Sequence, residues 1–420
     1  MRTEATAAAL GTVLGPAERG RGRRIAVLSH PAGMTHRNAF TDQLPTLALV
    51  GLGASETWIG FQRAFEPLSQ LLQLPTLRMV GRVRKRSILI AGQTIAVAGG
   101  APLAAYGALA SSGGDPALAL ALASLWLTAV GIVIAQTVWF PLLRCYVEPG
   151  RIGAFFGVLR TGWHLTLIAF YLGAQRWLER HPGGFGALFG VATAAGLVRL
   201  AMIARLPEPA SDGAPRLRAR DAVGLLRRHA GLRRYLAGMI LAGAPRRAAL
   251  PFALVMMRRS MGLSDADVML TTVASFAGGF ASLYAWGRLV DRLGPFSVFA
   301  GTALASAALL LWLAIAGSGA TLAALIAFFF VFAAMSAGVG VADTHVLFGL
   351  SPEREATPTL VIADVTTSLA YGAAPVLAGV ALDRAIAGGV DAATAYRSLF
   401  ALAAIAILCA PLPLRGLRRA

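Results

Sequence analysis

Ten long apolar stretches constrain the fold of this chain more than any other feature. They lie near residues 87–110, 117–140, 153–175, 184–205, 235–257, 267–289, 295–317, 320–343, 357–383 and 393–414. A helix needs about 20 apolar residues to cross a bilayer, and helices are expected because lipid offers no partner to open backbone groups. Only 14% of the 420 residues are charged, against roughly 25% in soluble domains. The sequence therefore predicts an all-α, multi-pass membrane protein.

The region before the first of these stretches is harder to assign. An even number of crossings requires two more between Leu44 and Val80, in fewer than about forty residues, which would make twelve transmembrane helices. The connecting turn lies either at 53–57 or at 63–67. We favour the first position, because it lets Glu56 reach water. We expect residues 1–39 to form a flexible cytoplasmic N-terminal tail, since this segment lacks the order of charged and apolar regions that marks a signal peptide.

The basic residues are concentrated in particular loops. The formal net charge is +18, and arginines cluster at 82–86, 205–234 and 415–419, whereas the turns at 111–117 and 317–320 carry none. Positive charge marks cytoplasmic loops. We therefore expect a multi-pass protein of a bacterial inner (plasma) membrane with both termini cytoplasmic. Arginines in these loops would contact the anionic headgroups of the lipid bilayer, which accounts for the positive net charge. The same distribution argues against a nucleic-acid partner.

A polar linker divides the apolar stretches into two sets. Residues 206–234 begin with prolines and end with a basic amphipathic segment, which lies either on the membrane surface or in solvent as a cytoplasmic linker. The predicted organisation is an N-terminal six-helix bundle at 40–205, this linker, a C-terminal six-helix bundle at 235–414, and a cytoplasmic tail at 415–420.

One short motif lies between two apolar stretches, the sequence Gly-Arg-Leu-Val-Asp-Arg-Leu-Gly at 287–294. It resembles the hinge loop of the major facilitator superfamily of secondary transporters. That resemblance implies twelve transmembrane helices in two pseudo-symmetric six-helix halves, which expose a central site to each side of the membrane in turn. It also implies a gating hinge made by Gly287, Asp291, Arg292 and Gly294. Gly287 would allow close helix approach, and Asp291 would accept from a neighbouring helix N-terminus and pair with a basic residue.

A weaker copy of the motif lies about half a chain earlier. The segment Gly81–Arg86 keeps the basic cluster of the hinge, but Gly81 stands where the motif has its aspartate and Leu77 where it has its leading glycine. Two related six-helix repeats would carry the same motif at corresponding positions. The subfamily is not identified by either copy.

Two adjacent arginines lie deep within an apolar stretch. Arg246 and Arg247 are near the middle of 235–257, with Pro245 and Pro251 on either side. A charged residue at mid-membrane depth is costly, by about 2.5–3.5 kcal/mol on insertion scales, and proline interrupts helical hydrogen bonding. These two residues are candidates for binding an anionic substrate group. The alternative is structural, with one arginine paired to a carboxylate and the other reaching toward the interface.

A polar stripe on another apolar stretch complements the arginines. Asp364, Thr367, Ser368 and Tyr371 recur with helical spacing and therefore share one face. We assign Ser368 and Tyr371 to substrate binding and Asp364 to proton coupling. Asp364 could instead pair with one of the arginines, or be solvated near the cytoplasmic surface.

These observations predict a secondary active transporter. It would move a small polar or anionic organic solute by alternating access, as a proton-coupled symporter or antiporter, and act as a monomer. The alternative is a non-transporting membrane assembly factor or sensor of the same fold. No catalytic motif, cofactor loop or metal-ligand spacing is present in the sequence, so we expect no enzyme, no cofactor and no metal site. Gln93, Gln136 and His164, which lie in apolar stretches, are expected to bond across helices.

Overall fold

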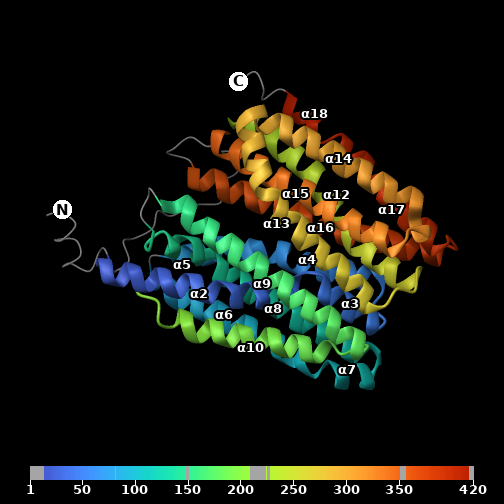
Figure 1. Ribbon diagram of the computed structural model, residues 1–420, viewed down its shortest axis with the longest axis horizontal. Helices are drawn as coiled ribbons and strands as arrows, with labels where there is room; N and C mark the ends of the chain where they lie inside the picture. The colour runs from blue at the N-terminus through green and yellow to red at the C-terminus, as the bar shows by residue number, and fades with distance from the viewer. Residues whose placement is uncertain are drawn as a thin grey trace. The chain divides into compact units, whose positions relative to one another are not determined.

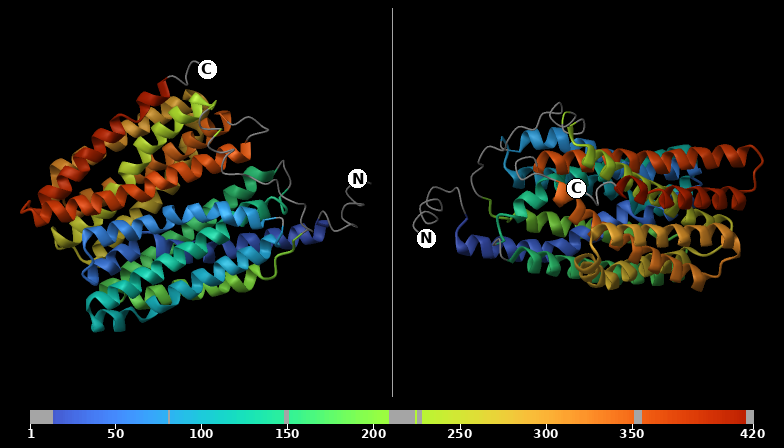
Figure 2. Two further views of the ribbon diagram at one scale, coloured as in Figure 1. Left: turned by 180° about the vertical axis from the view of Figure 1, so that it is seen from behind. Right: turned by 90° about the horizontal axis from the view of Figure 1, so that it is seen from above.

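The computed structural model describes residues 14–80, 82–147, 151–208, 224, 228–350 and 356–415. Within these residues the regular structure is helical, apart from one isolated bridge between Val80 and Val83. The helices form two compact units (Figures 1 and 2). Unit 1 contains residues 1–45, 69–170 and 184–217, and unit 2 contains residues 46–68, 171–183 and 218–420.

Unit 1 is a bundle of antiparallel helices. Helix α6 packs along α8, and α10 packs along α2 (Figure 1). The bounds of its helices are α2 Pro16–Thr41, α5 Gln73–Met79, α6 Lys85–Gly100, α7 Tyr106–Ser112, α8 Gly114–Leu143, α9 Ile152–Arg180 (of which only the first part belongs to this unit) and α10 Phe185–Ile203, with short 3₁₀ turns at Gln70–Leu72 and Ala101–Ala105.

Unit 2 is built in the same way from longer helices. Helix α13 packs along α15, α12 packs along α16, and α14 lies against both α15 and α17. The bounds are α3 Gln43–Gly51, α4 Glu56–Ser69, α12 Ala230–Arg259, α13 Asp265–Leu293, α14 Pro295–Ala316, α15 Leu322–Leu350, α16 Ala356–Ala387, α17 Ala392–Leu408 and α18 Pro411–Leu414, with a 3₁₀ turn at Gly317–Gly319.

The predicted spans agree with the helices. Ten helical segments of the described chain are long and apolar enough to cross a membrane, from Lys85–Ser112 to Ala392–Leu414, and each overlaps one of the ten apolar stretches. The protein is therefore an all-helical, multi-pass membrane protein. The total of twelve crossings and the symmetry of two halves stay predictions, because α2, α3, α4 and α5 are shorter or more polar than these ten.

Part of the predicted N-terminal tail is wrong. Residues 16–39 belong to helix α2, which buries Ala26, His36 and Ala39. Pro16 suits the first turn of a helix, and the Glu18 carboxylate accepts from the backbone N–H of Gly15 at 3.1 Å. The helix was missed because its arginines and histidines hide the apolar pattern. Residues 1–13 and 81 lie outside the described part of the chain, as do residues 209–223 and 225–227 of the linker expected at 206–234. The last residues of that linker, 230–234, belong to the beginning of α12.

The turn that follows is where the sequence favoured it. Helix α3 ends at Gly51 and α4 begins at Glu56. Gly53 takes a φ of +77° in this turn, a conformation that is open to glycine and strained for other residues. The alternative turn at 63–67 is excluded, because these residues are inside α4.

Small residues let α6 and α8 approach closely in unit 1. A Cβ atom added at Gly131 would lie 2.3 Å from the backbone nitrogen of Ala96, and one added at Gly92 would lie 2.5 Å from that of Ala135. Neither space can hold a side chain. Such contacts are typical of helices packed in lipid, where small residues allow the backbones to meet. They fix the position of α8, which carries several residues of the site described below.

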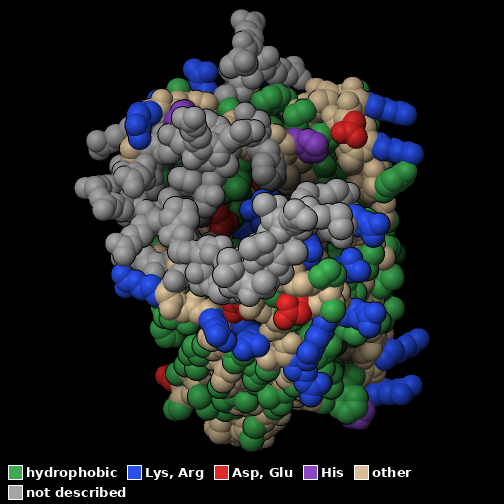
Figure 3. Space-filling model, turned by 90° about the vertical axis from the view of Figure 1, so that its left-hand side faces the viewer, with side chains coloured by type: hydrophobic (Ala, Val, Ile, Leu, Met, Phe, Trp, Pro, Cys, Tyr) green, Lys and Arg blue, Asp and Glu red, His purple; other side chains and the backbone are tan. Residues whose placement is uncertain are grey.

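The outer surfaces match a lipid environment with basic ends. Large apolar side chains such as Ile315, Leu377 and Leu402 are 69%, 68% and 66% exposed, respectively. On the face shown in Figure 3, Lys and Arg side chains are far more frequent than Asp and Glu. Exposed arginines also flank helix ends, including Arg82 before α6 and Arg144 after α8. This pattern is the one that predicted the cytoplasmic loops.

Glu208 secures the beginning of α6 in unit 1. Its two carboxylate oxygens accept from the backbone N–H groups of Lys85 and Arg86 at 2.6 and 3.0 Å. An anion is stabilised there by the open N–H groups and the dipole of the helix. Next to it, the Tyr146 hydroxyl donates to the carbonyl of Pro207 at 2.6 Å. Burial raises the pKa of this hydroxyl, so it stays protonated and remains a donor.

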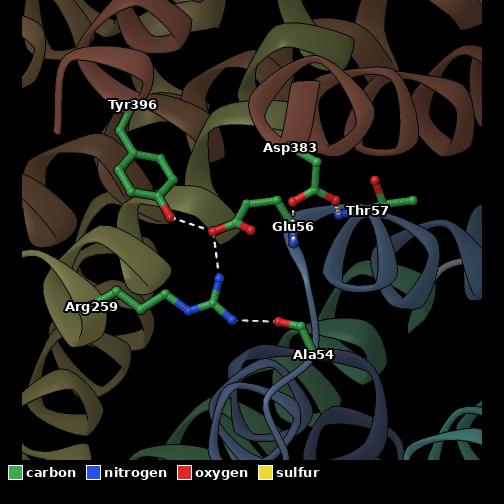
Figure 4. A network of polar contacts seen from close by, with 6 residues as sticks. All are labelled: Ala54, Glu56, Thr57, Arg259, Asp383 and Tyr396. Carbon is green, nitrogen blue, oxygen red and sulfur yellow. Dashed lines mark hydrogen bonds and ion pairs between the residues drawn. The ribbon is translucent and has the colours of Figure 1, made fainter. Parts of the chain in front are cut away.

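A carboxylate network secures the beginning of α4 in unit 2 (Figure 4). Glu56 is buried, and its Oε1 accepts from Arg259 of α12 at 2.5 Å and from the Tyr396 hydroxyl of α17 at 2.6 Å. Arg259 also donates to the carbonyl of Ala54. One carboxylate thus satisfies two donors from different helices.

A second carboxylate approaches the same turn from α16. Asp383 accepts from the backbone N–H groups of Glu56 and Thr57 at 3.2 and 2.8 Å (Figure 4). It caps α4 from a distant part of the sequence, as a local capping residue would. The turn before α4 is therefore held by α12, α16 and α17 together.

We expect Glu56→Ala to destabilise the protein by about 2–3 kcal/mol. Removing one partner of a buried ion pair costs about 3–5 kcal/mol, and the Arg259 side chain is 31% exposed, which lowers the cost. The measurement is the unfolding of the purified full chain in detergent. The matched control is Glu179→Ala, because Glu179 and its partner Arg176 are both largely exposed and such pairs contribute little. Equal effects of the two substitutions would contradict this account.

Candidate functional site

A partly open cavity lies within unit 1. Its volume is about 250 Å³, and it is surrounded by residues of α2, α6, α8, α9 and α10. Helices α2, α8 and α9 supply most of the wall, whereas α6 and α10 contribute one residue each, Gln93 and Arg199. Aromatic side chains and basic side chains share the lining. A pocket of this kind, apolar with a few polar groups, is the usual form of a small-molecule site.

Arg199 is the central polar residue of the cavity. Its side chain is 9% exposed, and it donates to no residue that the structure describes. Gly33 of α2 makes room for it, because a Cβ atom at position 33 would lie 1.6 Å from Nη1 of Arg199. The guanidinium thus lies between α2 and α10, and no carboxylate of the described residues pairs with it. A buried cation without a counter-ion is costly.

Trp139 of α8 lies against two basic side chains. The Arg199 guanidinium carbon lies 4.8 Å from the centre of the Trp139 ring, a cation–π contact. The His30 ring is stacked parallel to the same indole at 6.1 Å between ring centres. The aromatic face therefore holds Arg199 in one orientation and partly offsets the cost of burying it.

A histidine and a glutamine complete the inner wall. His36 is almost fully buried, and its Nδ1 lies 3.0 Å from the carbonyl oxygen of Ala192. Because a carbonyl only accepts, Nδ1 carries the hydrogen, and Nε2 of the neutral ring is left as an acceptor. Gln93 donates to the carbonyl of Gly196 at 3.5 Å. Gln136 leaves its side-chain oxygen without a partner in the described chain.

The cavity is positively charged. Arg37 of α2 and Arg160 of α9 line it together with Arg199, and no Asp or Glu is among its described lining residues. Like charges in one low-dielectric cavity repel each other. An anionic guest would relieve that repulsion, whereas a cationic guest would add to it.

The structure gives the two adjacent arginines of α12 different surroundings. Arg246 is buried, with Nη2 2.7 Å from the Ser306 hydroxyl and 3.5 Å from the carbonyl of Thr302, and its guanidinium carbon lies 5.8 Å from the centre of the Phe332 ring. Arg247 is exposed. Adjacent side chains on a helix point in directions about 100° apart, which explains why they do not share a site.

Arg247 lies against another of the predicted substrate-binding residues, Tyr371. Its guanidinium carbon lies 5.0 Å from the centre of the Tyr371 ring, and the Tyr371 hydroxyl donates to the carbonyl of Met239 at 3.2 Å. Ser368 is buried one turn earlier on α16. The structure therefore brings Arg247, Tyr371 and α16 together. The direct contacts of Arg246 are instead with Ser306, Thr302 and Phe332.

Asp364 is exposed on α16, about two turns after the helix begins. Neither Arg246 nor Arg247 forms an ion pair with it in the described chain. The predicted pairing with these arginines is therefore not observed. Proton coupling by Asp364 stays a prediction.

The hinge residues form the end of α13 and the turn after it. Gly294 has a φ of +78°, which favours glycine, and it terminates the helix. Gly287 has nothing within 4 Å of an added Cβ atom, so the expected close helix approach there is wrong. Asp291 and Arg292 are both exposed. Their gating role stays a prediction.

Sequence reasoning missed the principal residues of the cavity. His30, His36 and Arg37 lie on α2, which was taken as a tail, and Arg199 lies near the end of an apolar stretch, where it reads as an interfacial residue. The available signal was Gln93 and Gln136, two amides in apolar helices. Gln93 does bond across helices, as expected, whereas the Gln136 oxygen does not. His164, also expected to do so, bonds to the carbonyl of Arg160 in its own helix.

The described residues hold no cluster of three or more His, Cys, Asp or Glu side chains that could bind a metal ion. Cys145 and Cys409 are both free thiols. The cationic cavity of unit 1 is the candidate site considered below.

Comparisons with solved structures identify the fold. The nucleoside transporter NupG is 10% identical, with a TM-score of 0.73 over 95% of this chain and 99% of that chain. A D-xylose–proton symporter is 14% identical, with a TM-score of 0.69 over 92% and 96%. A bacterial homologue of the iron transporter ferroportin, in an inward-facing state, is 15% identical, with a TM-score of 0.70 over 94% and 98%. The chain has the fold of the major facilitator superfamily transporters.

Sequence comparisons add no further assignment. No protein-family model matches the chain, and no curated protein matches it. At these levels of identity the structural likeness shows the fold alone, so the solute must be inferred from the residues of the site.

We expect Arg199→Met to stabilise the ligand-free protein by about 1–3 kcal/mol, because the desolvation of an unpaired cation exceeds its gain from a cation–π contact. Methionine fills a similar volume without a charge. The measurement is the thermal midpoint of the purified full chain in detergent, with Arg176→Met as an exposed control. A clear fall in the midpoint would show that Arg199 is structural.

Proposed function

We propose that this protein is a secondary active transporter that moves a small organic anion across the membrane by alternating access. The fold supports transport, since the solved structures it resembles include transporters of nucleosides, sugars and peptides. In such folds two helical bundles expose a shared site to each side in turn. On this proposal the chain acts as a monomer in a bacterial inner membrane, with both termini cytoplasmic.

The observation that carries the proposal is the position of Arg199. An ionisable residue within membrane helices is expensive and commonly marks a substrate path. Arg199 is buried, lies beside a cavity of about 250 Å³ and has no carboxylate partner in the described chain. An anionic solute would supply that partner. A binding role explains these three features together, whereas a structural role predicts a paired arginine.

The residues of α12 and α16 have separate roles in this proposal. Arg247, resting on Tyr371, is a second cation that a solute could contact, with Ser368 nearby on α16. Arg246 holds α12 against α14 through Ser306, which supports the structural alternative for this residue. We propose that Asp364 exchanges the coupling proton and that Asp291 and Arg292 form the hinge between states.

Transport should depend on the cavity arginine. In proteoliposomes that contain the full chain, supplied from outside with a panel of labelled organic acids, sugars and nucleosides, we expect uptake of an organic acid. Arg199→Gln should raise its KM at least about tenfold, because a lost charge-assisted hydrogen bond is worth about 1.5–3 kcal/mol.

Arg176→Gln, an exposed control, should leave the flux unchanged. Absence of flux for every solute, together with copurification of a client protein, would instead support a non-transporting assembly factor. Unchanged transport in Arg247→Ala would remove that residue from the substrate path.

If Asp364 carries the coupling proton, its substitution should abolish proton-driven accumulation but not the exchange of solute. Asp364→Asn cannot release a proton, so accumulation driven by an imposed pH gradient should fall to background. Exchange of labelled for unlabelled solute needs no net proton movement and should persist. The measurement is the ratio of the two fluxes in one preparation, with Asp391→Asn as a control at the exposed cap of α17. Equal losses in both assays would contradict the assignment.

A further inference from the structure

Buried polar atoms without partners gather at the cavity in unit 1. The described chain has nine buried side-chain N or O atoms with no hydrogen bond, and two of them, on Arg258 and Asp265, form an ion pair with each other. Four of the remaining atoms line the cavity: His30 Nδ1, His36 Nε2, Gln136 Oε1 and Arg199 Nε. Native proteins seldom leave such groups unpaired. Their clustering indicates a site built for a guest.

The chemistry of these atoms differs along the wall. Arg199 Nε can only donate, so it requires an acceptor from the guest. The Gln136 oxygen can only accept, and His36 Nε2 accepts because Nδ1 donates to Ala192. A complementary guest therefore carries an acceptor at one end and a hydrogen-bond donor at another.

The positive charge of the cavity restricts the chemistry of both the acceptor and the donor of the guest. Arg37, Arg160 and Arg199 line the cavity without a described carboxylate, so the acceptor is favoured as an anion. The same field disfavours an ammonium group as the donor. A neutral hydroxyl remains, because it donates to Gln136 or His36 without adding positive charge.

The rest of the wall sets the shape of the guest. Trp139, Phe140, Phe156 and Trp163 line the cavity with aromatic surface, and the rings of Phe140 and Phe156 lie 5.9 Å apart. Aromatic rings prefer to stack on planar apolar groups. A volume of about 250 Å³ is small among ligand pockets, whose usual range begins at about 300 Å³. It suits one ring rather than a disaccharide or a peptide. Inorganic phosphate would leave the aromatic surface uncovered.

We propose that the cavity binds a small planar monocarboxylate that also carries a neutral hydroxyl group, such as a hydroxylated aromatic acid. The carboxylate faces Arg199, the ring lies among the aromatic side chains, and the hydroxyl donates to Gln136 or His36. This inference rests on the proposed function for the identity of the site, and it adds the class of solute.

The test is calorimetric binding of four probes to the purified full chain in lipid nanodiscs. The probes are 4-hydroxybenzoate, benzoate, 4-hydroxybenzamide and 4-(aminomethyl)benzoate, which share one ring and change one group at a time. We expect 4-hydroxybenzoate to bind most tightly. Loss of the anion or addition of the ammonium group should weaken binding at least tenfold, and loss of the hydroxyl should weaken it several-fold. Equal binding of the amide, or no binding of any probe, would overturn the proposal.

Variants then assign each group of the probe to its partner. Gln136→Leu should reduce the preference for 4-hydroxybenzoate over benzoate while benzoate binding is retained. Arg199→Gln should weaken both acids at least tenfold. Arg176→Gln, at the exposed ion pair with Glu179, should change neither. If neither Gln136→Leu nor His36→Phe reduces the preference for 4-hydroxybenzoate over benzoate, the proposed contact of the ligand hydroxyl with these residues is wrong.

Binding and flux together separate this inference from the proposed function. If no aromatic acid binds but another organic anion is transported in an Arg199-dependent manner, the solute class is wrong and the transporter proposal stands. If 4-hydroxybenzoate binds through Arg199 but no solute crosses the membrane, the site is right and the transporter proposal is wrong. If inorganic phosphate at equal concentration displaced 4-hydroxybenzoate from the cavity, the claim that the solute has a planar apolar ring would be contradicted.

Discussion

A buried guanidinium without a carboxylate is the interaction on which this account depends. Arg199 lies between α2 and α10, opposite a glycine whose missing side chain leaves room for it, and against the face of Trp139. The aromatic contact orients the cation but does not neutralise it. The surrounding helices are held rigidly enough to keep this arrangement, because α6 and α8 meet through backbone contacts at Gly92 and Gly131. On our proposal, unit 1 is preorganised for an anion, since the described residues supply no carboxylate to Arg199.

A second buried arginine, Arg246, has hydrogen-bond acceptors from the protein. Arg246 donates to Ser306 and Thr302 on the neighbouring helix α14. Glu56 likewise collects Arg259 and Tyr396 at the start of α4. In the described chain the Nε atoms of both Arg199 and Arg246 lack a hydrogen bond. The difference is that Arg246 has acceptors on a neighbouring helix, whereas Arg199 lies with three other unpaired buried atoms around one cavity.

Much of the fold could be predicted from hydrophobicity. Ten apolar stretches became ten helices, and the turn before α4 was placed correctly because Glu56 could not be left in lipid. Instead of reaching water, Glu56 is buried in a network with residues from α12 and α17, far away in the sequence. Helix α2 was missed because its sequence is polar, and three of its polar residues, His30, His36 and Arg37, line a cavity that only the folded bundle creates. A polar helix that lines a site looks like a solvated tail in the sequence.

The site was harder to predict for the same physical reason. Arg246 and Arg247 were conspicuous because they lie at mid-membrane depth, yet depth does not reveal whether a neighbouring helix supplies a hydroxyl such as that of Ser306. Arg199 was inconspicuous near the end of its helix, although Gly33 admits it to the interior. Gly287 was assigned to close packing from its motif, but open space surrounds it. Contacts between distant segments decide these roles, and no local pattern encodes them.

The most direct test of the central claim is a cryo-electron microscopy map of the full chain in nanodiscs with saturating 4-hydroxybenzoate. The account predicts density for the ligand inside unit 1, with its carboxylate at hydrogen-bonding distance from the Arg199 guanidinium and its ring beside Trp139. A map in which Arg199 pairs with a carboxylate of the protein, while the cavity holds no ligand, would contradict it.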